Sequence, residues 1–404
     1  MNVEAQAAGV FVSSTNATTR PGLDLRTLRS EAELLAVRDV WLRWQQHPHT
    51  DYEFFLTIAR VRPEVISPYV IAVYRDGQPE TLLLGRLEQS CVDLSVGYLR
   101  LFRFPVRQLT FVYRGVLGNA SPENCRALVR EVQACLKREK AQVAHFHFVP
   151  VDSPMYRAVC EGSSAGWRDL TESRPHWVMR LPSHVDTILN GLSAKARKNR
   201  RYEAARLMKD FDNDVRVECY SNESDLPRIL DEAESIACRT YQRGLGVGFV
   251  ANDENRERFL IEAQRGRFRG YFLYLRGKPV AFFLGTLDQK VLYDNFTSYD
   301  PEYSKYSPGT YLFYQIFERI CGADIEAIDF GFGDAWYKSH FGTEQSQETN
   351  ISVFARGVTT LGLNVLRIPI RTVDRLGKYA VANMGFLRSI KKKWRDRAQR
   401  RAAV

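Results

Sequence analysis

Apolar residues recur along the chain with two different periods, and these periods predict which segments are helices and which are strands. Apolar positions three and four apart predict a helix, whereas short β-branched and aromatic runs predict a strand. Helical spacing is found in residues 26–47, 51–60, 121–140, 183–210, 225–242, 252–266 and 307–320. Strand-like runs are found in residues 69–88, 108–118, 143–150, 215–220, 271–288, 291–296, 327–332 and 351–357. The chain is therefore predicted to belong to the α/β class.

The stretch from Val291 to His340 predicts a βαβ unit that ends in a polar loop. The runs VLYDNF and AIDFGF read as strands, and a helix between them makes a parallel pair the expected arrangement. Ser307-Pro308 predicts the helix start, because serine can cap and proline at the first helical position loses no hydrogen bond. The polar loop follows the second strand, at the edge where open α/β sheets bind ligands.

The order of predicted elements occurs twice. Each half of the chain contains a hairpin, a strand, a helix opened by Ser-Pro and a further strand. The matching features are residues 74–79 and 274–279 (274 − 74 = 200), Ser121-Pro122 and Ser307-Pro308, and residues 145–148 and 328–332. A period this long predicts a duplicated domain. Chance similarity between two common hairpins is the alternative, and the agreement of four consecutive elements disfavours it.

Composition and charge narrow the class of protein. A chain of 404 residues has room for two or three domains, and a net charge of +10 favours anionic partners. The basic stretches 195–209 and 387–401 are either solvated helical surface or binding surface. The seven scattered cysteines include no CxxC pair, so neither a disulfide framework nor a zinc site is expected, and a cytoplasmic location fits. No apolar run reaches the length of about 18 residues that a membrane span needs.

Two groups of residues are candidates for chemistry. The start of the predicted helix could hold a phosphate on its free backbone N–H groups, and the alternative is an ordinary capped helix. In the loop after the second strand, a carboxylate or imidazole could take a proton from an amine and a tyrosine could return one to a leaving group. There the alternative is a polar loop whose aspartate is hydrogen-bonded into the core. The candidates are Lys305, Ser307, Gly309 and Thr310 at the helix start and Asp329, Tyr337, Lys338 and His340 in the loop.

Residues 175–355 resemble acyltransferases of the GNAT superfamily, in the branch of the FemAB-like and CelD-like proteins. The resemblance is carried by LSAKARKNRRYEAARL, YFLYLRGKPVAFFLG, VLYDNFTSYDPEY with the following SPGTYLFYQIFERI, and IDFGFGDAWYKSHFG. It implies two tandem GNAT-like domains, each a mixed twisted sheet flanked by helices. We expect a disordered tail over residues 1–24, a degenerate N-terminal domain over 25–170, an acyltransferase domain over 171–360 and a basic helical tail over 361–404.

The same resemblance implies roles for the candidate residues. Acyl-CoA would place its pyrophosphate on Lys305, Ser307, Gly309 and Thr310, although the family's second glycine is missing here. The first half has Glu123 in place of Gly309, so only the second half is expected to bind the cofactor. Asp329 or His340 would act as base, Tyr337 as acid for the thiolate and Lys338 as a cofactor or substrate contact. No metal is expected.

The predicted function is that of an acyl-CoA-dependent N-acyltransferase with an amine acceptor, which is an envelope polysaccharide, a lipid amine or a small metabolite. The basic C-terminus could then contact an anionic membrane from the cytoplasmic side. A Fem-type transferase that uses aminoacyl-tRNA is one alternative, and a non-catalytic scaffold with a GNAT fold is another. The chain lacks the long helical arm that tRNA-using relatives often insert, so a nucleic-acid partner is not expected.

Overall fold

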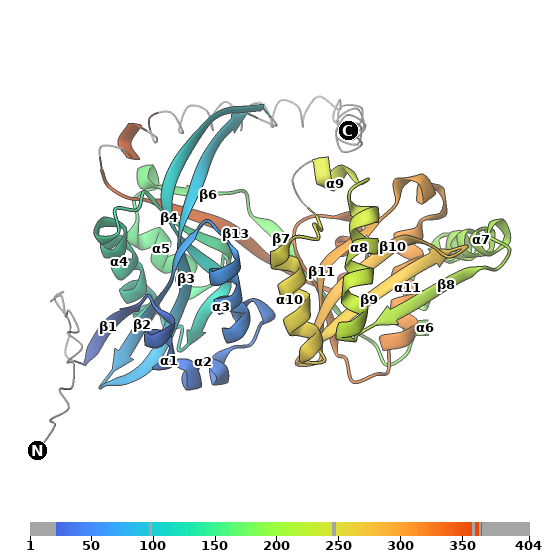
Figure 1. Ribbon diagram of the computed structural model, residues 1–404, viewed down its shortest axis with the longest axis horizontal. Helices are drawn as coiled ribbons and strands as arrows, with labels where there is room; N and C mark the ends of the chain where they lie inside the picture. Colours follow the sequence, from blue (N-terminus) through green and yellow to red (C-terminus); the bar gives the residue numbers. More distant parts are fainter. Residues whose placement is uncertain (1–21, 97–98, 245–247, 358–359, 363–364, 366–404) are drawn as a thin grey trace, which may run out of the picture.

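The computed structural model describes residues 22–96, 99–244, 248–357, 360–362 and 365, and its strands form one continuous sheet (Figure 1). The strand order is β1-β2-β3-β4-β5-β13-β7-β12-β11-β10-β9-β8, with the short β6 beside β13. The strands are β1 Leu23–Leu28, β2 Val65–Arg75, β3 Gln78–Val96, β4 Leu99–Gly118, β5 Val143–Pro150, β6 Arg168–Leu170, β7 Arg174–Arg180, β8 Val215–Tyr220, β9 Phe268–Leu275, β10 Lys278–Asp288, β11 Val291–Tyr299, β12 Ala327–Phe332 and β13 Glu344–Phe354.

The sheet consists of two half-sheets with the same topology, which confirms the predicted fold class. In each half, four antiparallel strands are followed by a parallel neighbour, β4 beside β5 and β11 beside β12. The sixth strand of each half is antiparallel to that neighbour: β13 completes the N-terminal half-sheet and β7 completes the C-terminal half-sheet. Because β7 and β13 also pair with each other, the last described strand of the chain joins the two halves.

Helices cover both faces of each half-sheet. The N-terminal half has α1 Glu31–Leu35, α2 Arg38–Trp44, α3 Tyr52–Val61, α4 Pro122–Arg138 and α5 Pro154–Gly162. The C-terminal half has α6 Val185–Gly191, α7 Ala194–Asp210, α8 Leu226–Ala237, α9 Tyr241–Gly244, α10 Asp253–Gln264, α11 Pro308–Ile320 and α12 Trp336–Phe341. Among the described helices, none is both long enough and apolar enough to cross a membrane.

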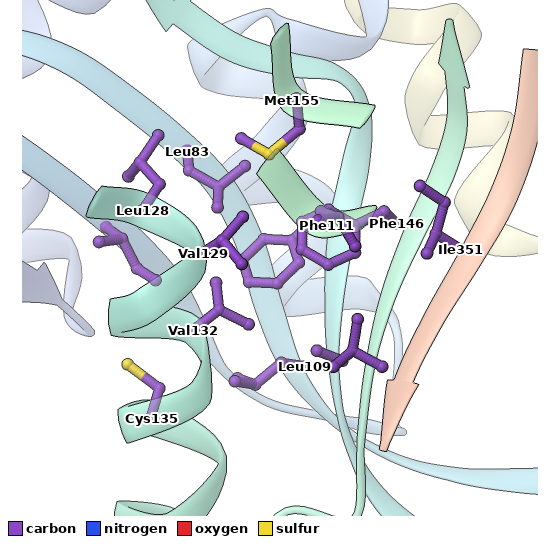
Figure 2. Close-up of a cluster of buried hydrophobic side chains, with 14 of the residues drawn as sticks. Leu83, Leu109, Phe111, Leu128, Val129, Val132, Cys135, Phe146, Met155 and Ile351 are labelled. Atoms are coloured by element: carbon purple, nitrogen blue, oxygen red, sulfur yellow. The ribbon is translucent and has the colours of Figure 1, made fainter. Parts of the chain in front are cut away.

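Separate hydrophobic cores fill the space between each sheet face and its helices. In the N-terminal half, α4 packs Val129 and Val132 against Phe111 and Phe146, whose rings stack 4.6 Å apart (Figure 2). Trp41 is fully buried on the opposite face of that half-sheet. In the C-terminal half, α11 and α12 cover one face while α8 and α10 cover the other. Each half-sheet therefore lies between two layers of packed apolar side chains.

The N-terminus differs from the sequence prediction. In place of the single helix predicted over residues 26–47, the structure has a strand, β1, up to Leu28 and then two short helices, α1 and α2, within the predicted range. Ser30 ends the strand segment, because its hydroxyl accepts the Glu33 N–H while the Glu33 carboxylate accepts the Ser30 N–H. Residues 1–21 of the predicted disordered tail lie outside the described residues, and its last residues begin β1.

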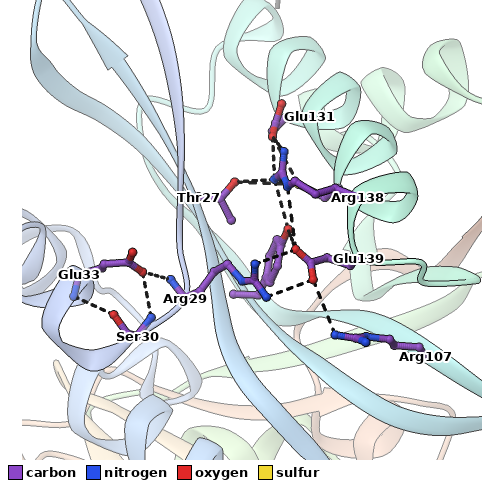
Figure 3. Close-up of polar contacts among 10 residues, drawn as sticks. Thr27, Arg29, Ser30, Glu33, Arg107, Glu131, Arg138 and Glu139 are labelled. Atoms are coloured by element: carbon purple, nitrogen blue, oxygen red, sulfur yellow. Dashed lines mark hydrogen bonds and ion pairs between the residues drawn. The ribbon is translucent and has the colours of Figure 1, made fainter. Parts of the chain in front are cut away.

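A buried carboxylate ties β1 to the end of α4 (Figure 3). Glu139 lies 3.0 Å from Arg29 Nη1 and 3.7 Å from Arg107 Nη2, and it accepts a hydrogen bond from the Tyr69 hydroxyl at 3.2 Å. With Arg138 Nε at 3.9 Å, three arginines and a phenol thus compensate one buried charge, as burial requires. The predicted basic tail over residues 361–404 lies almost wholly outside the described residues, and the limits 25–170 and 171–360 remain predictions.

Candidate active site

The parallel strands β11 and β12 separate in the middle of the C-terminal half-sheet. Their pairing runs from Val291↔Ala327 to Tyr293↔Asp329, although both strands continue beyond these residues. Each strand also has an irregular register with its other neighbour at this level, next to Gly285 and next to Gly331. The sheet therefore opens at the carboxyl ends of its two parallel strands, where α/β sheets bind ligands.

Asp329 is the last residue of β12 that pairs with β11, and its side chain already has partners. Its Oδ1 lies 2.7 Å from His176 Nε2 and accepts the Gly331 N–H at 2.7 Å. Burial raises the pKa of Asp329, but the contacts with His176 outweigh burial and hold the pKa below its usual value. A carboxylate in this state is a weak base, so its arrangement agrees better with the alternative of an aspartate tied into the core.

His176 of β7 joins both halves of the molecule. Its Nδ1 lies 3.3 Å from Glu348 Oε2 of β13 and 3.1 Å from the Tyr113 hydroxyl of β4. Burial lowers the pKa of His176, but Asp329 and Glu348 outweigh burial and raise it to about 9. The imidazolium is therefore the stable form at neutral pH, and it bridges a carboxylate from each of two neighbouring strands.

Asp294 of β11 is a functional candidate that the sequence prediction missed. Its Oδ2 accepts a hydrogen bond from the Tyr337 hydroxyl at 2.8 Å, while its Oδ1 has no hydrogen-bond partner among the described residues. Burial raises the pKa of Asp294 to about 6, and Lys338 and Tyr337 offset part of that rise. A buried carboxylate with a pKa close to neutrality and one free oxygen is suited to accept a proton.

The helix α12 brings Tyr337 and Lys338 back over the opening. Gly331 and Gly333 have φ angles of 72° and 111°, which allow the chain to turn sharply after β12. Tyr337 stacks on Phe313 of α11 with ring centroids 5.2 Å apart, and Lys338 Nζ donates to the Phe332 carbonyl at 3.0 Å. Burial lowers the pKa of Lys338, and the nearby aspartates offset part of this effect.

His340, the other predicted base, does not join this group. Its side chain is exposed and stacks on Trp336, with ring centroids 4.5 Å apart and planes 15° from parallel. The structure thus brings together Asp329, Tyr337 and Lys338 around the opening and leaves His340 on the outer face of α12.

The start of α11 differs in detail from the predicted cap. Ser307 has a left-handed backbone, with φ 51° and ψ 48°, and its side chain accepts no capping hydrogen bond, so the prediction of a serine cap is wrong. The first helical bond runs from the Tyr311 N–H to the Ser307 carbonyl. The backbone N–H groups of Gly309 and Thr310 have no partner among the described residues, and the exposed Lys305 lies over the Tyr306 ring. This helix end can therefore receive an anion.

The corresponding helix start in the N-terminal half is already occupied. Ser121 caps α4 by accepting the Asn124 N–H at 3.2 Å, and Glu123 in the first turn pairs with Arg75 at 3.3 Å. A serine side chain and a carboxylate stand where an anionic ligand would bind. The asymmetry agrees with the expectation that the C-terminal half holds the cofactor.

Histidines of the N-terminal half lie against the opening. The His47 ring lies 4.7 Å from the Tyr293 ring and 5.0 Å from the Tyr113 ring, both edge to face. Burial holds the pKa of His47 well below its usual value, and His49 lowers it further. Neutral imidazoles and phenols from the N-terminal half therefore line one side of the site.

Comparison with known proteins finds similarity to a family model and to several solved structures. Residues 194–339 match a family model described as an acetyltransferase (GNAT) domain. The FemX crystal structure superimposes with a TM-score of 0.48 and 13% identity, covering 74% of this chain and 90% of that chain. A tandem GNAT protein from the clavulanic acid biosynthesis pathway superimposes with a TM-score of 0.48 and 10% identity, and the match covers 83% of this chain and 99% of that chain. L-PGS from Bacillus licheniformis superimposes with a TM-score of 0.43 and 11% identity, and the match covers 83% of this chain and 96% of that chain. No curated protein matches the sequence.

Proposed function

Because the chain carries a GNAT acyltransferase domain over residues 194–339, as its resemblance to that superfamily predicted, we propose that it transfers an acyl group from acyl-CoA to an amine. The observation that carries this proposal is the opening between β11 and β12. The helix α11, with the free N–H groups of its first turn, begins beyond this opening. The hydrogen-bonded pair of Asp294 and Tyr337 lies within the opening. A thioester held in the opening would have an anion site on one side and a proton acceptor beside it.

The donor side of the site is α11. The N–H groups of Gly309 and Thr310, together with the positive end of the helix dipole, would hold the pyrophosphate of acyl-CoA. Lys305 is exposed next to this end and adds a cation. A single glycine suffices here, because Ser307 in its left-handed conformation and Pro308 already turn the chain away from the ligand.

The proton transfers are assigned to Asp294 and Tyr337. Asp294 takes a proton from the acceptor ammonium, and the free amine attacks the thioester carbonyl carbon. Unpaired backbone N–H groups at the strand edge would stabilise the oxyanion. When the C–S bond breaks, Tyr337 donates its proton to the thiolate and recovers one from Asp294 across their 2.8 Å hydrogen bond. The ionised Asp294 then takes the second proton from the nitrogen of the new amide and releases it to solvent. Asp294 takes the role predicted for Asp329 or His340, because no ion pair within 4 Å holds its carboxylate among the described residues and its pKa of about 6 suits the task.

A panel of acyl-CoA chain lengths tests the donor. We expect at least one of acetyl-, octanoyl- and palmitoyl-CoA to stabilise the full chain by about 2.7 kcal/mol at 100 times its Kd. Thiol release in the presence of simple amines then reports turnover with the same donor. Absence of any stabilisation by all three thioesters would contradict the proposal, and stabilisation without turnover by any amine would favour the scaffold alternative.

One observation favours a different donor, aminoacyl-tRNA. Helix α7 buries only Leu207, and its exposed cations Lys195, Lys198 and Arg201 have no ion-pair partner among the described residues. Such a helix could contact RNA phosphates. Binding of tRNA whose affinity falls steeply between 50 and 200 mM salt, in a protein that no acyl-CoA stabilises, would support this second function.

A further inference from the structure

Arg258 of α10 is a buried cation without a counter-ion. It is 8% exposed, and the described part of the chain holds no carboxylate within 4 Å of its guanidinium. Within the described parts of the chain, its one hydrogen bond goes to the side-chain oxygen of Asn295. A guanidinium has five N–H donors, so most of them bond to no described protein group.

The nearest carboxylates on the same helix serve other arginines. Glu254 and Glu262 lie one helical turn to either side of Arg258, and they pair with Arg62 at 2.6 Å and with Arg267 at 2.8 Å. Burial lowers the pKa of Arg258 to about 10, an effect that the two glutamates only partly offset. Keeping an unpaired charge this deeply buried costs free energy, and a bound anion would relieve that cost.

The surroundings of Arg258 come from both halves of the molecule. Its guanidinium lies 5.5 Å from the centre of the Phe54 ring of α3, and the His49 ring lies 6.0 Å from the same ring. Burial, with Arg258 and Arg86 as the next causes, lowers the pKa of His49 to about 3. The region is therefore electropositive, and its imidazole stays neutral and able to donate or accept a hydrogen bond.

Arg258 is connected directly to the candidate active site. Asn295 follows the proposed base Asp294 in β11, and its amide group donates to Thr286 Oγ1 at 2.8 Å. That bond fixes the amide so that its oxygen faces Arg258. Because α10 and α12 cover opposite faces of the half-sheet, a ligand bound by Arg258 would reach Asp294 through the opening between β11 and β12.

We propose that Arg258 anchors an anionic group, a phosphate or a carboxylate, of the amine acceptor. The acceptor is then a molecule that carries both an amine and an acid, such as an amino acid derivative or a phosphorylated amine. Its anion lies between α10 and the N-terminal half, and its amine lies at the opening. The assignment rests on the proposed function for the identity of the ligand, whereas the anion site itself depends only on Arg258 and its surroundings.

The test measures anion binding in the full chain with the donor site already filled. Protein saturated with CoA is titrated with inorganic phosphate or with succinate at constant ionic strength, and the unfolding temperature is followed. Wild type is compared with Arg258→Gln and with Arg256→Gln, a matched control two residues away whose side chain is 40% exposed and pairs with Asp231. We expect Arg258→Gln to weaken binding of the preferred anion about tenfold or more, and Arg256→Gln to leave it unchanged.

The outcomes separate the two proposals. Stronger stabilisation by phosphate indicates a phosphorylated acceptor, and stronger stabilisation by succinate indicates a carboxylate. Equal anion affinity in wild type and Arg258→Gln, or no stabilisation of wild type by either anion, overturns the site. Should Arg258→Gln not fold, Arg258→Lys decides: a loss of about threefold or more supports the site, because an ammonium lacks the bidentate geometry, and unchanged affinity overturns it. If CoA does not raise the unfolding temperature but the anions do, the proposed function is contradicted and the anion site is supported.

Discussion

Two aspartates on neighbouring strands have opposite pKa shifts because their surroundings differ. Asp329 faces an imidazolium, which holds its pKa low, whereas burial raises the pKa of Asp294 to about 6 and its hydrogen bond with Tyr337 offsets only part of that rise. Residues whose pKa values are pushed apart in this way divide the roles of base and electrostatic support between them. The first prediction follows from the raised pKa of Asp294.

Replacing Asp294 by asparagine keeps the size of the side chain and removes the proton acceptor. We expect acyl transfer at neutral pH to fall by about 10²–10⁴-fold. In wild type the rate should rise with pH through about 6 as Asp294 ionises, and the variant should lose that limb. Steady-state rates from pH 5 to 8 provide the measurement. Asp334→Asn, an exposed residue in the same loop, is the control, and an unchanged pH profile in Asp294→Asn would show that another group is the base.

The raised pKa of His176 predicts a pH dependence of stability. The folded-state pKa of about 9 lies above the ordinary 6.5, so the stabilisation is complete below pH 6.5 and is lost as the pH rises through 9. The difference corresponds to about 3 kcal/mol. Urea unfolding at pH 6.5 and pH 9.5 should show this loss in wild type and a flatter dependence in His176→Gln. The exposed His184→Gln serves as control, and equal slopes in all three proteins would contradict the assignment.

At the scale of single residues, the sequence predicted the loop that lies at the opening but did not point to Asp294, the base we propose. Tyr337 and Lys338 stood out because ionisable residues crowd one loop, and α12 does carry both to the opening. His340 stood out for the same reason, yet the helical repeat places it beside Trp336 and away from the site. Asp294 gave no signal, because a single polar residue within an apolar strand becomes distinctive only when α12 folds over it.

At the scale of elements, the start of α11 yields the next prediction. Gly309→Glu reproduces the carboxylate that the N-terminal half has at Glu123, and it should weaken acyl-CoA binding by about tenfold through repulsion of the pyrophosphate. Gly309→Ala is the matched control, since a Cβ there would lie 3.4 Å from the Tyr299 ring, an ordinary contact. Isothermal titration calorimetry compares the two. If Gly309→Glu and Gly309→Ala bind acyl-CoA with similar affinity, the pyrophosphate does not bind at the start of α11.

Most elements with a local signal were predicted correctly, apart from the Ser307 cap and the single helix over residues 26–47, whereas segments that depend on partners were not. The hairpins around Gly77 and Gly277, the cap at Ser121 and the parallel pair of β11 and β12 all appear as expected. The first half of β13, residues 344–350, is polar, and its strand conformation comes from pairing with β7 and β5. The extension of β3 and β4 beyond residues 69–88 and 108–118 likewise comes from the pairing of each strand with the other.

At the scale of the whole molecule, the N-terminal half-sheet is completed by β13, which comes after the C-terminal half in the sequence. We therefore predict that the N-terminal half does not fold by itself. A fragment of residues 22–170 lacks β13, whose buried Ile351 and Val353 belong to the core beneath α4. Each of these side chains contributes about 1.5–3 kcal/mol on burial. We expect the fragment to show no cooperative thermal transition by circular dichroism, and the same fragment joined by a flexible linker to residues 344–354 to regain one. A cooperative melt of the fragment alone would contradict this expectation.

The large distance along the chain between β5 and β13 also has a consequence for synthesis on the ribosome. The strand beside which β13 inserts ends at Pro150, whereas β13 itself ends at Phe354, so 354 − 150 = 204 further residues must be translated before the N-terminal half-sheet is complete. At about 5–20 residues per second, this takes about 10–40 s. During that interval the edge of β5 has no permanent neighbour, and a nascent chain of this protein is a natural client for chaperones that shield unpaired strands.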